Sequence, residues 1–148
     1  MSKLALVTLL ASLAGCAASP TPVTNGNFAK ASPAVDKKVA DDAVKKLAGL
    51  YPPAITRFDL QQVAADSFGA SLVATLRAQG YALLEPKSAS RSGADHKNGN
   101  RTLSYVFDQP SGTDLYRITL TIGDQSLSRV YLAKDGSVAP AGYWVRKE

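Results

Sequence analysis

From residue 35 to residue 47, every fourth residue is apolar, as in a helix with one buried face. Its start is marked by Ser32-Pro33, because serine caps free helix amides and proline suits the first helical turn. Pro52-Pro53 ends it, since proline cannot continue a helix. Charged residues occupy mainly the other face. The pattern therefore predicts an amphipathic helix built on Val35, Val39, Ala43 and Leu47.

A strand, a second helix and another strand are predicted next. Residues 56–60 alternate apolar and polar side chains, as a short strand does. Residues 61–79 then carry an apolar stripe at helical spacing, and Gly80 suits the left-handed position that follows a helix. Residues 81–85 return to a strand pattern. A unit of about 30 residues has the length of a crossover that joins two parallel strands.

The remainder of the chain is rich in strand patterns. Residues 103–107, 116–122 and 127–132 each alternate apolar and polar side chains, and turn residues separate them. Asp135-Gly136 is a hairpin signal. Residues 142–145 form either a final short strand or a tail docked on the sheet. The predicted fold class is α+β, with two helices packed on a small, mostly antiparallel sheet in the order α-β-α-β-β-β-β.

The N-terminus has the pattern of a short export signal. Lys3 is followed by an apolar run of about ten residues, shorter than the roughly 20 that a membrane-spanning helix needs. The run ends in Leu13-Ala14-Gly15-Cys16, which resembles the bacterial lipobox. That resemblance implies a diacylglycerol on the Cys16 thiol and removal of residues 1–15 as a lipoprotein signal peptide. The residue after the cysteine is Ala17 and not an aspartate. By the sorting rule of such lipoproteins, this implies the outer membrane of a Gram-negative cell.

The single cysteine and the segment after it indicate how the chain is anchored. Cys16 has no partner for a disulfide within the chain, which agrees with a lipid on its thiol. Several acyl chains anchor stably, whereas one chain binds a membrane only marginally. Residues 16–31 are polar and contain proline, and we expect them to form a flexible lipidated tether before a single α+β periplasmic domain at 32–148. Alternatively, the tether orders on a partner, with Val23 and Phe28 as its anchors.

The charge of the chain does not indicate a nucleic-acid-binding protein. The formal net charge is +5, a mild excess, whereas nucleic-acid binding usually shows as Lys and Arg clustered on one face. Four basic residues and the only histidine fall in the polar segment 87–101, but no aromatic residue there can stack on a base. No direct contact with nucleic acid is therefore expected. Binding of lipopolysaccharide phosphate by this segment remains an alternative.

Residues that could carry catalysis are scattered along the sequence. Motifs for zinc hydrolases, serine nucleophiles, phosphate loops and dinucleotide binding are absent from it. We therefore expect no enzyme activity, no metal and no cofactor besides the covalent lipid on Cys16. Asp59 and Asp66 suit helix capping and first-turn positions. A periplasmic enzyme or inhibitor that uses Asp59, Asp66 and His96 remains an alternative if the three meet in a cleft.

Two aromatic residues near the C-terminus are candidates for protein contact. Tyr143 and Trp144 are adjacent, and such rings are over-represented among interface hot spots. Packing of these rings in the core is the alternative. With Val23 and Phe28, they complete the set of candidate partner-binding residues.

Several of these features together resemble the TrbH family of conjugal transfer lipoproteins. They are the lipobox, the tether with its prolines, the alanine-rich helix at 39–47, and the pattern Phe-Gly-x-x-Leu…Leu-x-x-x-Gly-Tyr at 68–81. The resemblance covers roughly residues 1–85, and the β-rich end in outline. The segment 87–101 matches no motif of that family.

The resemblance implies a structural subunit of the mating-pair-formation apparatus, a type IV secretion system that moves plasmid DNA between cells. It implies a place in the outer-membrane core complex, beside TrbG-like and TrbI-like subunits, in a ring anchored through Cys16. The resemblance implies no catalytic residue. A different envelope assembly or transport lipoprotein, whose sheet holds a lipid or an outer-membrane partner, is the other open function. An apolar groove beside the sheet would favour it.

Overall fold

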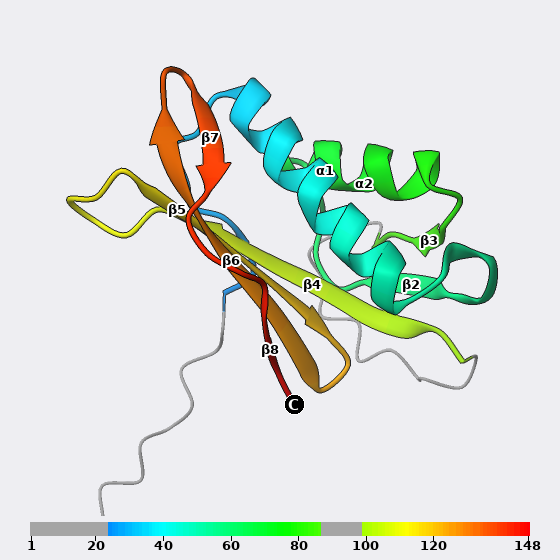
Figure 1. Cartoon of the computed structure of the whole chain (residues 1–148). Coiled ribbons are helices and arrows are strands. Elements are labelled where there is room, and N and C mark those ends of the chain that lie inside the picture. Colours follow the sequence, from blue (N-terminus) through cyan, green and yellow to red (C-terminus); the bar gives the residue numbers. More distant parts are fainter. Residues whose placement is uncertain (1–23, 87–98) are drawn as a thin grey trace, which may run out of the picture.

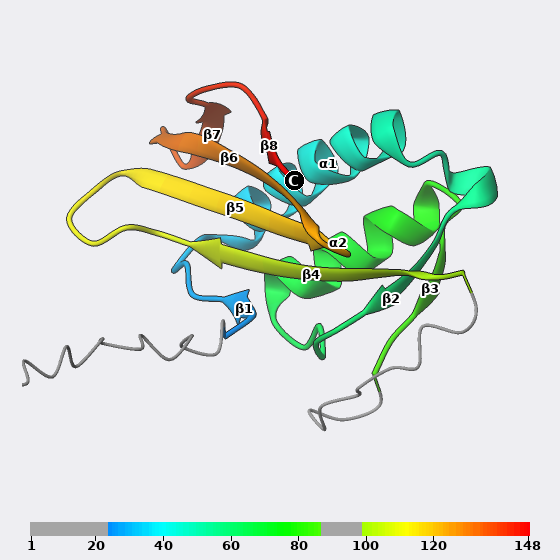
Figure 2. The same cartoon turned by 90° about the horizontal axis from the view of Figure 1, so that it is seen from below.

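The computed structural model describes residues 24–86 and 99–148, which form an eight-stranded sheet with two helices on one face (Figure 1, Figure 2). The strand order is β3-β2-β4-β5-β6-β7, with β1 paired to β4 and β8 paired to β6. The predicted α+β class, with two helices on a mostly antiparallel sheet, is confirmed. In chain order the elements are β1 (Gly26–Asn27), α1 (Pro33–Leu50), the 3-10 turn η1 (Pro53–Ile55), β2 (Arg57–Leu60), α2 (Ser67–Ala78), β3 (Ala82–Leu84), β4 (Arg101–Asp108), β5 (Leu115–Ile122), β6 (Gln125–Lys134), β7 (Ser137–Pro140) and β8 (Val145–Lys147).

Helix α1 begins and ends where the sequence predicts. The Ser32 hydroxyl accepts a hydrogen bond from the Val35 amide at 3.4 Å, and Pro33 is the first helical residue. The helix ends at Leu50, just before the two prolines. All four residues of the predicted apolar repeat are buried in the core. The amphipathic pattern therefore placed the buried face of this helix correctly.

Helix α2 is shorter than the sequence predicts, and the predicted start at residue 61 is wrong. The helix begins at Ser67, and the Asp66 carboxylate caps it by accepting a backbone hydrogen bond at 2.8 Å. The residues before the cap lie along β4 instead. There the Gln62 side-chain amide accepts from the Tyr105 amide at 3.1 Å and donates to the Tyr105 carbonyl at 2.9 Å. These two bonds to β4 hold the segment out of the helix.

The elements β2, α2 and β3 form the crossover unit that the sequence predicts. Strands β2 and β3 are parallel, with Phe58 opposite Leu83. Strand β2 also pairs in parallel with the start of β4, with Phe58 opposite Arg101. The successive pairs β4–β5, β5–β6 and β6–β7 are antiparallel. In the strand order, β3, β2 and β4 therefore form a parallel part of the sheet, and β4 to β7 form an antiparallel meander.

The turn between β6 and β7 has the conformation that its residues predict. Asp135 and Gly136 have φ values of 48° and 72°, the left-handed conformations that a two-residue hairpin turn requires. The predicted element order nevertheless omits β1, β7 and β8. Of the two expectations for residues 142–145, each is met in part, because β8 begins at Val145 and Trp144 packs against the core.

Strand β1 lies within the segment that the sequence assigns to the tether. Gly26 and Asn27 pair in parallel with β4, and the Phe28 amide donates to the Phe107 carbonyl at 2.7 Å. A strand of two residues has no alternation by which a sequence pattern could reveal it. Residues 16–23 lie outside the described residues, so their role as a lipidated tether stays a prediction.

Aromatic rings fill the space between the helices and the sheet. Phe68 of α2 stacks on Phe107 of β4 with 4.7 Å between ring centroids, and Tyr105 meets the Phe68 ring edge-on at 5.1 Å. Towards β3, the Tyr81 hydroxyl donates to the Tyr51 carbonyl at 2.6 Å. These contacts fix α1 and α2 on the same face of the sheet and leave the other face for contacts outside the core.

Candidate partner-binding site

The candidate partner-binding residues differ in how far the structure exposes them. Tyr143 is 93% exposed and Phe28 is 53% exposed. Trp144 is half-buried and packs against the core. Val23 and the lipidation candidate Cys16 lie outside the described residues. The structure therefore separates the adjacent aromatic residues into a docked ring and a ring that faces solvent.

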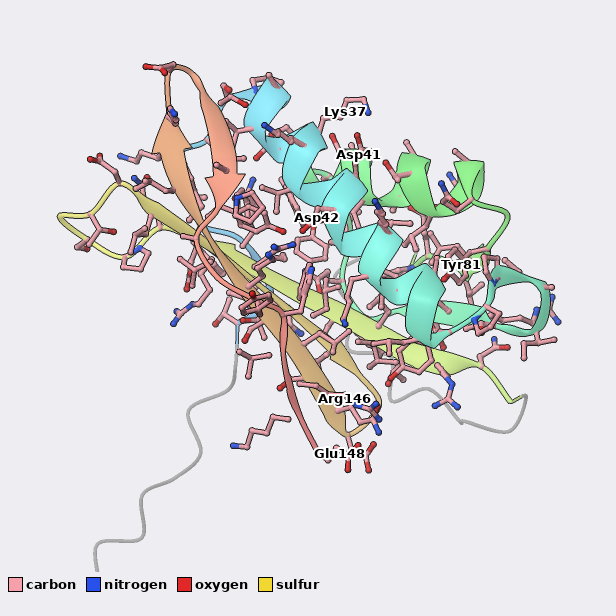
Figure 3. The ribbon with its side chains drawn as sticks, viewed as in Figure 1. Lys37, Asp41, Asp42, Tyr81, Arg146 and Glu148 are labelled. Atoms are coloured by element: carbon pink, nitrogen blue, oxygen red, sulfur yellow. The ribbon has the colours of Figure 1, made fainter. Side chains whose placement is uncertain are left out.

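Residues 141–148, here called the C-terminal arm, are held to the sheet by backbone pairing. The Ala141 amide donates to the Val130 carbonyl at 2.9 Å, and β8 pairs antiparallel with residues 126–128 of β6. At the end of the arm, Arg146 and Glu148 form an ion pair with 2.8 Å between nitrogen and oxygen (Figure 3). The arm is thus joined to the sheet at Ala141 and through the three residues of β8.

A single arginine side chain connects the arm to helix α1. The Nε atom of Arg129, on β6, donates to the Gly142 carbonyl at 2.9 Å, and Nη1 donates to the Asp42 carboxylate at 2.8 Å. Its guanidinium carbon lies 5.9 Å from the Trp144 ring centroid and 5.8 Å from that of Tyr131. Cation–π contacts of this kind stabilise stacked arrangements. Arg129 therefore fixes the position of Trp144.

Asp42 supplies the charge that holds this arrangement together. Its Oδ2 atom accepts from Arg129 and also from the Tyr131 hydroxyl, the latter at 2.6 Å, and Asp42 lies on α1 (Figure 3). Burial raises the pKa of Tyr131 above its ordinary value, and the hydrogen bond to Asp42 raises it further. The tyrosine hydroxyl therefore stays a hydrogen-bond donor at physiological pH.

Tyr143 is exposed, although the residues that follow it are held against the sheet. Trp144 on one side is docked, and Val145 on the other begins β8 and is itself 61% exposed. A tyrosine ring offers a large contact area with few rotatable bonds, and such rings are over-represented among interface hot spots. Tyr143 and Val145 together thus have the properties of an anchor for protein contact.

Phe28 borders a surface hollow at another place on the molecule. Its backbone amide is held by Phe107, as described above, while the ring is half exposed. The hollow has a volume of about 440 Å³ and lies between the segment that follows β1 and the turn that joins β4 to β5. Lys30 and Asp114 lie on its border. An apolar side chain of a partner could lie here against the Phe28 ring.

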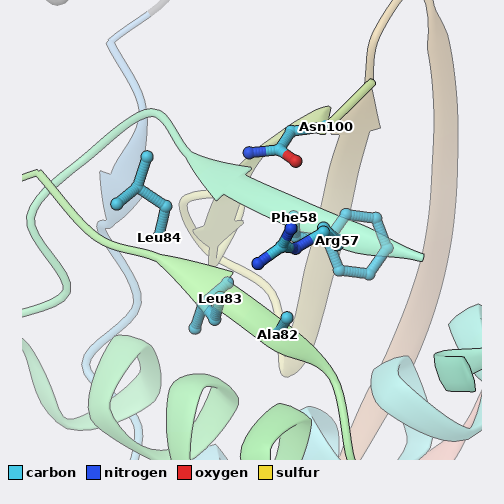
Figure 4. Close-up of a pocket in the computed structure, with 6 residues that line it drawn as sticks. All are labelled: Arg57, Phe58, Ala82, Leu83, Leu84 and Asn100. Carbon is cyan, nitrogen blue, oxygen red and sulfur yellow. The ribbon is translucent and has the colours of Figure 1, made fainter. Parts of the chain in front are cut away.

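A further pocket lies beside β2 and β3, with a volume of about 480 Å³ (Figure 4). Asn100 borders it, and the Oδ1 atom of Asn100 accepts no hydrogen bond from the described part of the chain. Leu84, at the outer strand of the sheet, is 57% exposed. The lining combines apolar and polar side chains, namely Arg57, Phe58, Ala82, Leu83, Leu84 and Asn100.

The described chain contains two of the three residues proposed for an enzyme or inhibitor. Asp66 caps α2 and accepts a hydrogen bond from the Tyr105 hydroxyl at 2.7 Å, as its predicted capping role requires. Asp59 lies in β2, and His96 lies outside the described residues. Within residues 24–86 and 99–148, no group of three His, Cys, Asp or Glu side chains is placed to hold a metal ion.

Sequence reasoning missed the two residues that position the arm. Arg129 and Asp42 lie on different elements, far apart in the chain, so no local pattern connects them. The available signal was the alternation along the strand, which places Arg129 on the same face as the apolar residues Leu127 and Tyr131. An arginine that points towards the core needs an acidic partner, which here is Asp42 of α1.

Comparisons with known proteins give one result. No curated protein and no solved structure matches the chain. Of the described helices, none combines the length and apolar character needed to cross a membrane. The family described as conjugal transfer protein TrbH, in contrast, matches residues 19–148, which include both helices, the whole sheet and the C-terminal arm. The chain therefore belongs to the TrbH family of conjugal transfer proteins.

Proposed function

We propose that this protein is a non-catalytic, lipid-anchored subunit of the outer-membrane core complex of a conjugative type IV secretion system. In this proposal the acylated Cys16 holds the domain at the periplasmic face of the outer membrane, and the C-terminal arm contacts TrbG-like or TrbI-like subunits in a ring. Membership of the TrbH family supports the role in conjugal transfer. The lipobox supports the anchor.

The observation that carries the contact surface is the exposed ring of Tyr143 beside the docked ring of Trp144. Tyr143 is 93% exposed and Val145 is 61% exposed, and large uncovered apolar side chains that lie together are typical of a protein contact. Phe28, within the segment predicted to be the tether, gives a second anchor. Several weak contacts of this kind suffice in a ring, because membrane anchoring raises the effective concentration of the subunits.

The anchor is tested by comparing the wild type with Cys16→Ser in fractionated envelopes. Wild type should be recovered with outer membranes, and mass spectrometry should find acyl chains on Cys16. The serine variant should lose membrane retention, because serine offers no thiol for the lipid. An unmodified thiol on the native protein would exclude this anchoring mechanism.

The contact surface is tested by pull-down from detergent-solubilised envelopes of cells that carry the whole transfer system. Tyr143→Ser should recover fewer core-channel subunits than the wild type. Ile55→Ser is the matched control, because Ile55 is 84% exposed but lies on η1, away from the arm. Equal recovery with both variants would refute the arm as the contact surface, and failure of wild type to recover any core subunit would refute the core-complex role.

The pocket beside β2 and β3 favours a second candidate function, in which an envelope transport lipoprotein holds a lipid chain. Leu83 and Leu84 give this otherwise largely polar pocket an apolar part next to a sheet edge. Native mass spectrometry of protein purified from envelopes should then find a co-purified lipid. Ala82→Trp, which would fill the pocket, should remove that lipid, and a wild type without lipid would exclude this function.

A further inference from the structure

An apolar turn protrudes where α1 passes into β2. It consists of Pro52, Pro53, Ala54 and Ile55, here called the apolar tip, and it lies at one end of the molecule in both views (Figure 1, Figure 2). Ile55 is 84% exposed, and Pro52 and Ala54 are exposed as well. Packing in the core therefore does not explain why these residues are apolar.

The backbone of the apolar tip presents few amides that need water. Its two prolines have no amide hydrogen. The Ile55 amide donates to the Pro52 carbonyl at 3.2 Å, and the Thr56 amide donates to the Pro53 carbonyl at 3.4 Å. Polar groups that are bonded within a turn can enter an apolar environment at a lower cost than groups that lose their water. The tip is thus suited to a surrounding that offers few hydrogen bonds.

Cations surround the apolar tip. Lys45 and Lys46 precede it on α1, Arg57 follows it on β2, and residues 43–58 include no Asp or Glu. The guanidinium carbon of Arg101, on β4, lies 5.2 Å from the ring centroid of the tyrosine that comes just before the tip. In the described part of the chain, none of these four cations forms an ion pair.

Two carboxylates lie near this end of the domain without reversing its charge. Asp59 comes two residues after Arg57 on β2. Asp124 precedes Gln125, whose side chain accepts a hydrogen bond from the Tyr51 hydroxyl at 2.7 Å. Against the four cations, these two groups leave the surroundings of the apolar tip positively charged.

We infer that the apolar tip enters the surface of an anionic lipid membrane, with the surrounding cations at the headgroups. A peripheral membrane contact gains from buried apolar side chains and from the attraction of Lys and Arg to anionic lipids. Long basic side chains keep their charged ends among the headgroups while their stems lie along apolar surface. Protein interfaces, in contrast, centre on Trp, Tyr and Arg, which the tip lacks.

The length of chain before β1 allows the tip to reach the membrane that holds the proposed lipid anchor. Gly26 follows Cys16 by ten residues, which span at most about 35 Å. Gly26 lies beside Val106 of β4, and the strand from Val106 back to Arg101 covers roughly 17 Å. Anchor and tip can therefore meet one bilayer together, and the inference rests on the proposed anchor for its choice of membrane.

Fluorescence quenching in vesicles tests the inference. Ile55→Cys is purified from envelopes, labelled on the new thiol with an environment-sensitive fluorophore, and reconstituted into vesicles of phosphatidylethanolamine and phosphatidylglycerol. Its emission should shift to shorter wavelength and be quenched by lipids that carry a nitroxide high in the acyl chain. Lys134→Cys is the matched control, because Lys134 is exposed at the opposite end of β6 from Gln125, and its label should stay hydrated and unquenched.

Removal of charge gives the second measurement. Arg57→Gln in the labelled Ile55→Cys chain should lower the docking equilibrium constant, read from the quenched fraction, by about fivefold, since each cation near an anionic surface contributes roughly that factor. Lys134→Gln in the same chain should leave the constant unchanged. No bilayer remains in solubilised envelopes, so Ile55→Ser still serves as the pull-down control for Tyr143→Ser.

Failure of the inference and failure of the anchor are distinguishable. A parent chain that takes up the label on Cys16 has a free thiol and refutes the anchor, while the difference in quenching between Ile55→Cys and the parent still decides the inference. An unquenched label at Ile55 in a chain whose Cys16 is blocked would overturn the inference and leave the anchor standing. Crosslinking of that unquenched site to a core-channel subunit in envelopes would assign the tip to a protein partner instead.

Discussion

Among single residues, Gly69 carries the tightest steric constraint. It lies in the first turn of α2, and a Cβ there would overlap the Tyr105 hydroxyl and lie 2.9 Å from Ala64. The tyrosine cannot move away freely, because its hydroxyl donates to the Asp66 carboxylate that caps α2. The Phe-Gly pair in the family pattern therefore marks the point where α2 touches β4.

This constraint predicts that Gly69→Ala destabilises the protein. Overpacking at such a contact typically costs about 1–3 kcal/mol, which we expect as a lower free energy of unfolding in urea. Gly49→Ala is the matched control, because Gly49 is also helical but has open space around it. The control should gain about 0.5–1 kcal/mol from helix propensity. Equal stability of the two variants would contradict the steric explanation.

At the scale of elements, one edge of β4 is covered by three different groups. Strand β2 pairs with its first residues, β1 pairs with Val106 and Phe107, and the Gln62 amide covers Tyr105 between them. A side chain thus completes the hydrogen bonding of a strand at the point where two short strands leave a gap. The backbone of Tyr105 would otherwise have no partner on this side within the described chain.

Gln62→Ala should therefore expose the backbone of β4 locally. Loss of a partner for buried polar groups costs about 1–3 kcal/mol, and amide hydrogen exchange at Tyr105 should become faster. Gln61→Ala is the control, since the Gln61 side chain only donates to the Asp59 carbonyl at an exposed site. Unchanged exchange at Tyr105 in Gln62→Ala would show that the side-chain amide does not act as a strand substitute.

The C-terminal arm is the element whose position depends most on one side chain. Arg129→Ala should release the arm, because it removes the bonds to Gly142 and Asp42 and the stacking on Trp144. Trp144 is the only tryptophan, so its fluorescence should shift to longer wavelength as the ring becomes hydrated. Arg117→Ala removes an exposed ion pair elsewhere and should leave the spectrum unchanged. An unshifted spectrum in Arg129→Ala would mean that β8 pairing alone holds the ring.

The elements that sequence could predict are those whose signals are local. The caps and prolines around α1, and the Asp135-Gly136 turn, act within a few residues and were read correctly. The start of α2 was predicted wrongly, because residues 61–65 suit a helix locally while Gln62 bonds a strand 43 positions later in the chain. Of the site, Tyr143 was predictable as an exposed aromatic, whereas the Arg129 and Asp42 contact depends on the fold.

At the scale of the whole molecule, a buried carboxyl group links stability to pH. Asp36, on the first turn of α1, is fully buried, and Ser67 of α2 donates a hydrogen bond to its Oδ2 atom. Its Oδ1 atom has no partner among the described residues. Burial raises the pKa of Asp36 above its ordinary value, the hydrogen bond from Ser67 lowers it by less, and the negative charge of Asp66 adds the smallest effect, a further rise.

The folded state therefore holds the Asp36 proton more tightly than the unfolded state does. The stability that this proton confers is present below the unfolded pKa and is lost as the pH rises through the folded pKa. Relative to wild type, Asp36→Asn should gain stability as the pH rises above 3.8, the ordinary pKa of the group, in urea titrations at several pH values. A stability difference that is constant with pH would contradict the raised pKa.

Asp41→Asn supplies a control of opposite sign in the same helix. The hydrogen bond from Lys37 lowers the pKa of Asp41, so its charged form stabilises the folded state above the unfolded pKa. This variant should lose stability relative to wild type as the pH rises towards 3.8 from below, and its difference from wild type should stay constant above that pH. Parallel curves for the two variants would mean that a general effect of the substitutions, and not the two pKa shifts, determines the result.

The pairing of β1 with β4 has a consequence for the order of biogenesis. The N-terminal strand leaves the ribosome first, yet its binding edge consists of Val106 and Phe107, which are made much later. Long-range parallel pairing of this kind closes late in folding. Until then, β1 has no pairing with the rest of the sheet. The proposed removal of residues 1–15 and acylation of Cys16 would therefore take place on a chain whose first strand is not yet paired with the sheet.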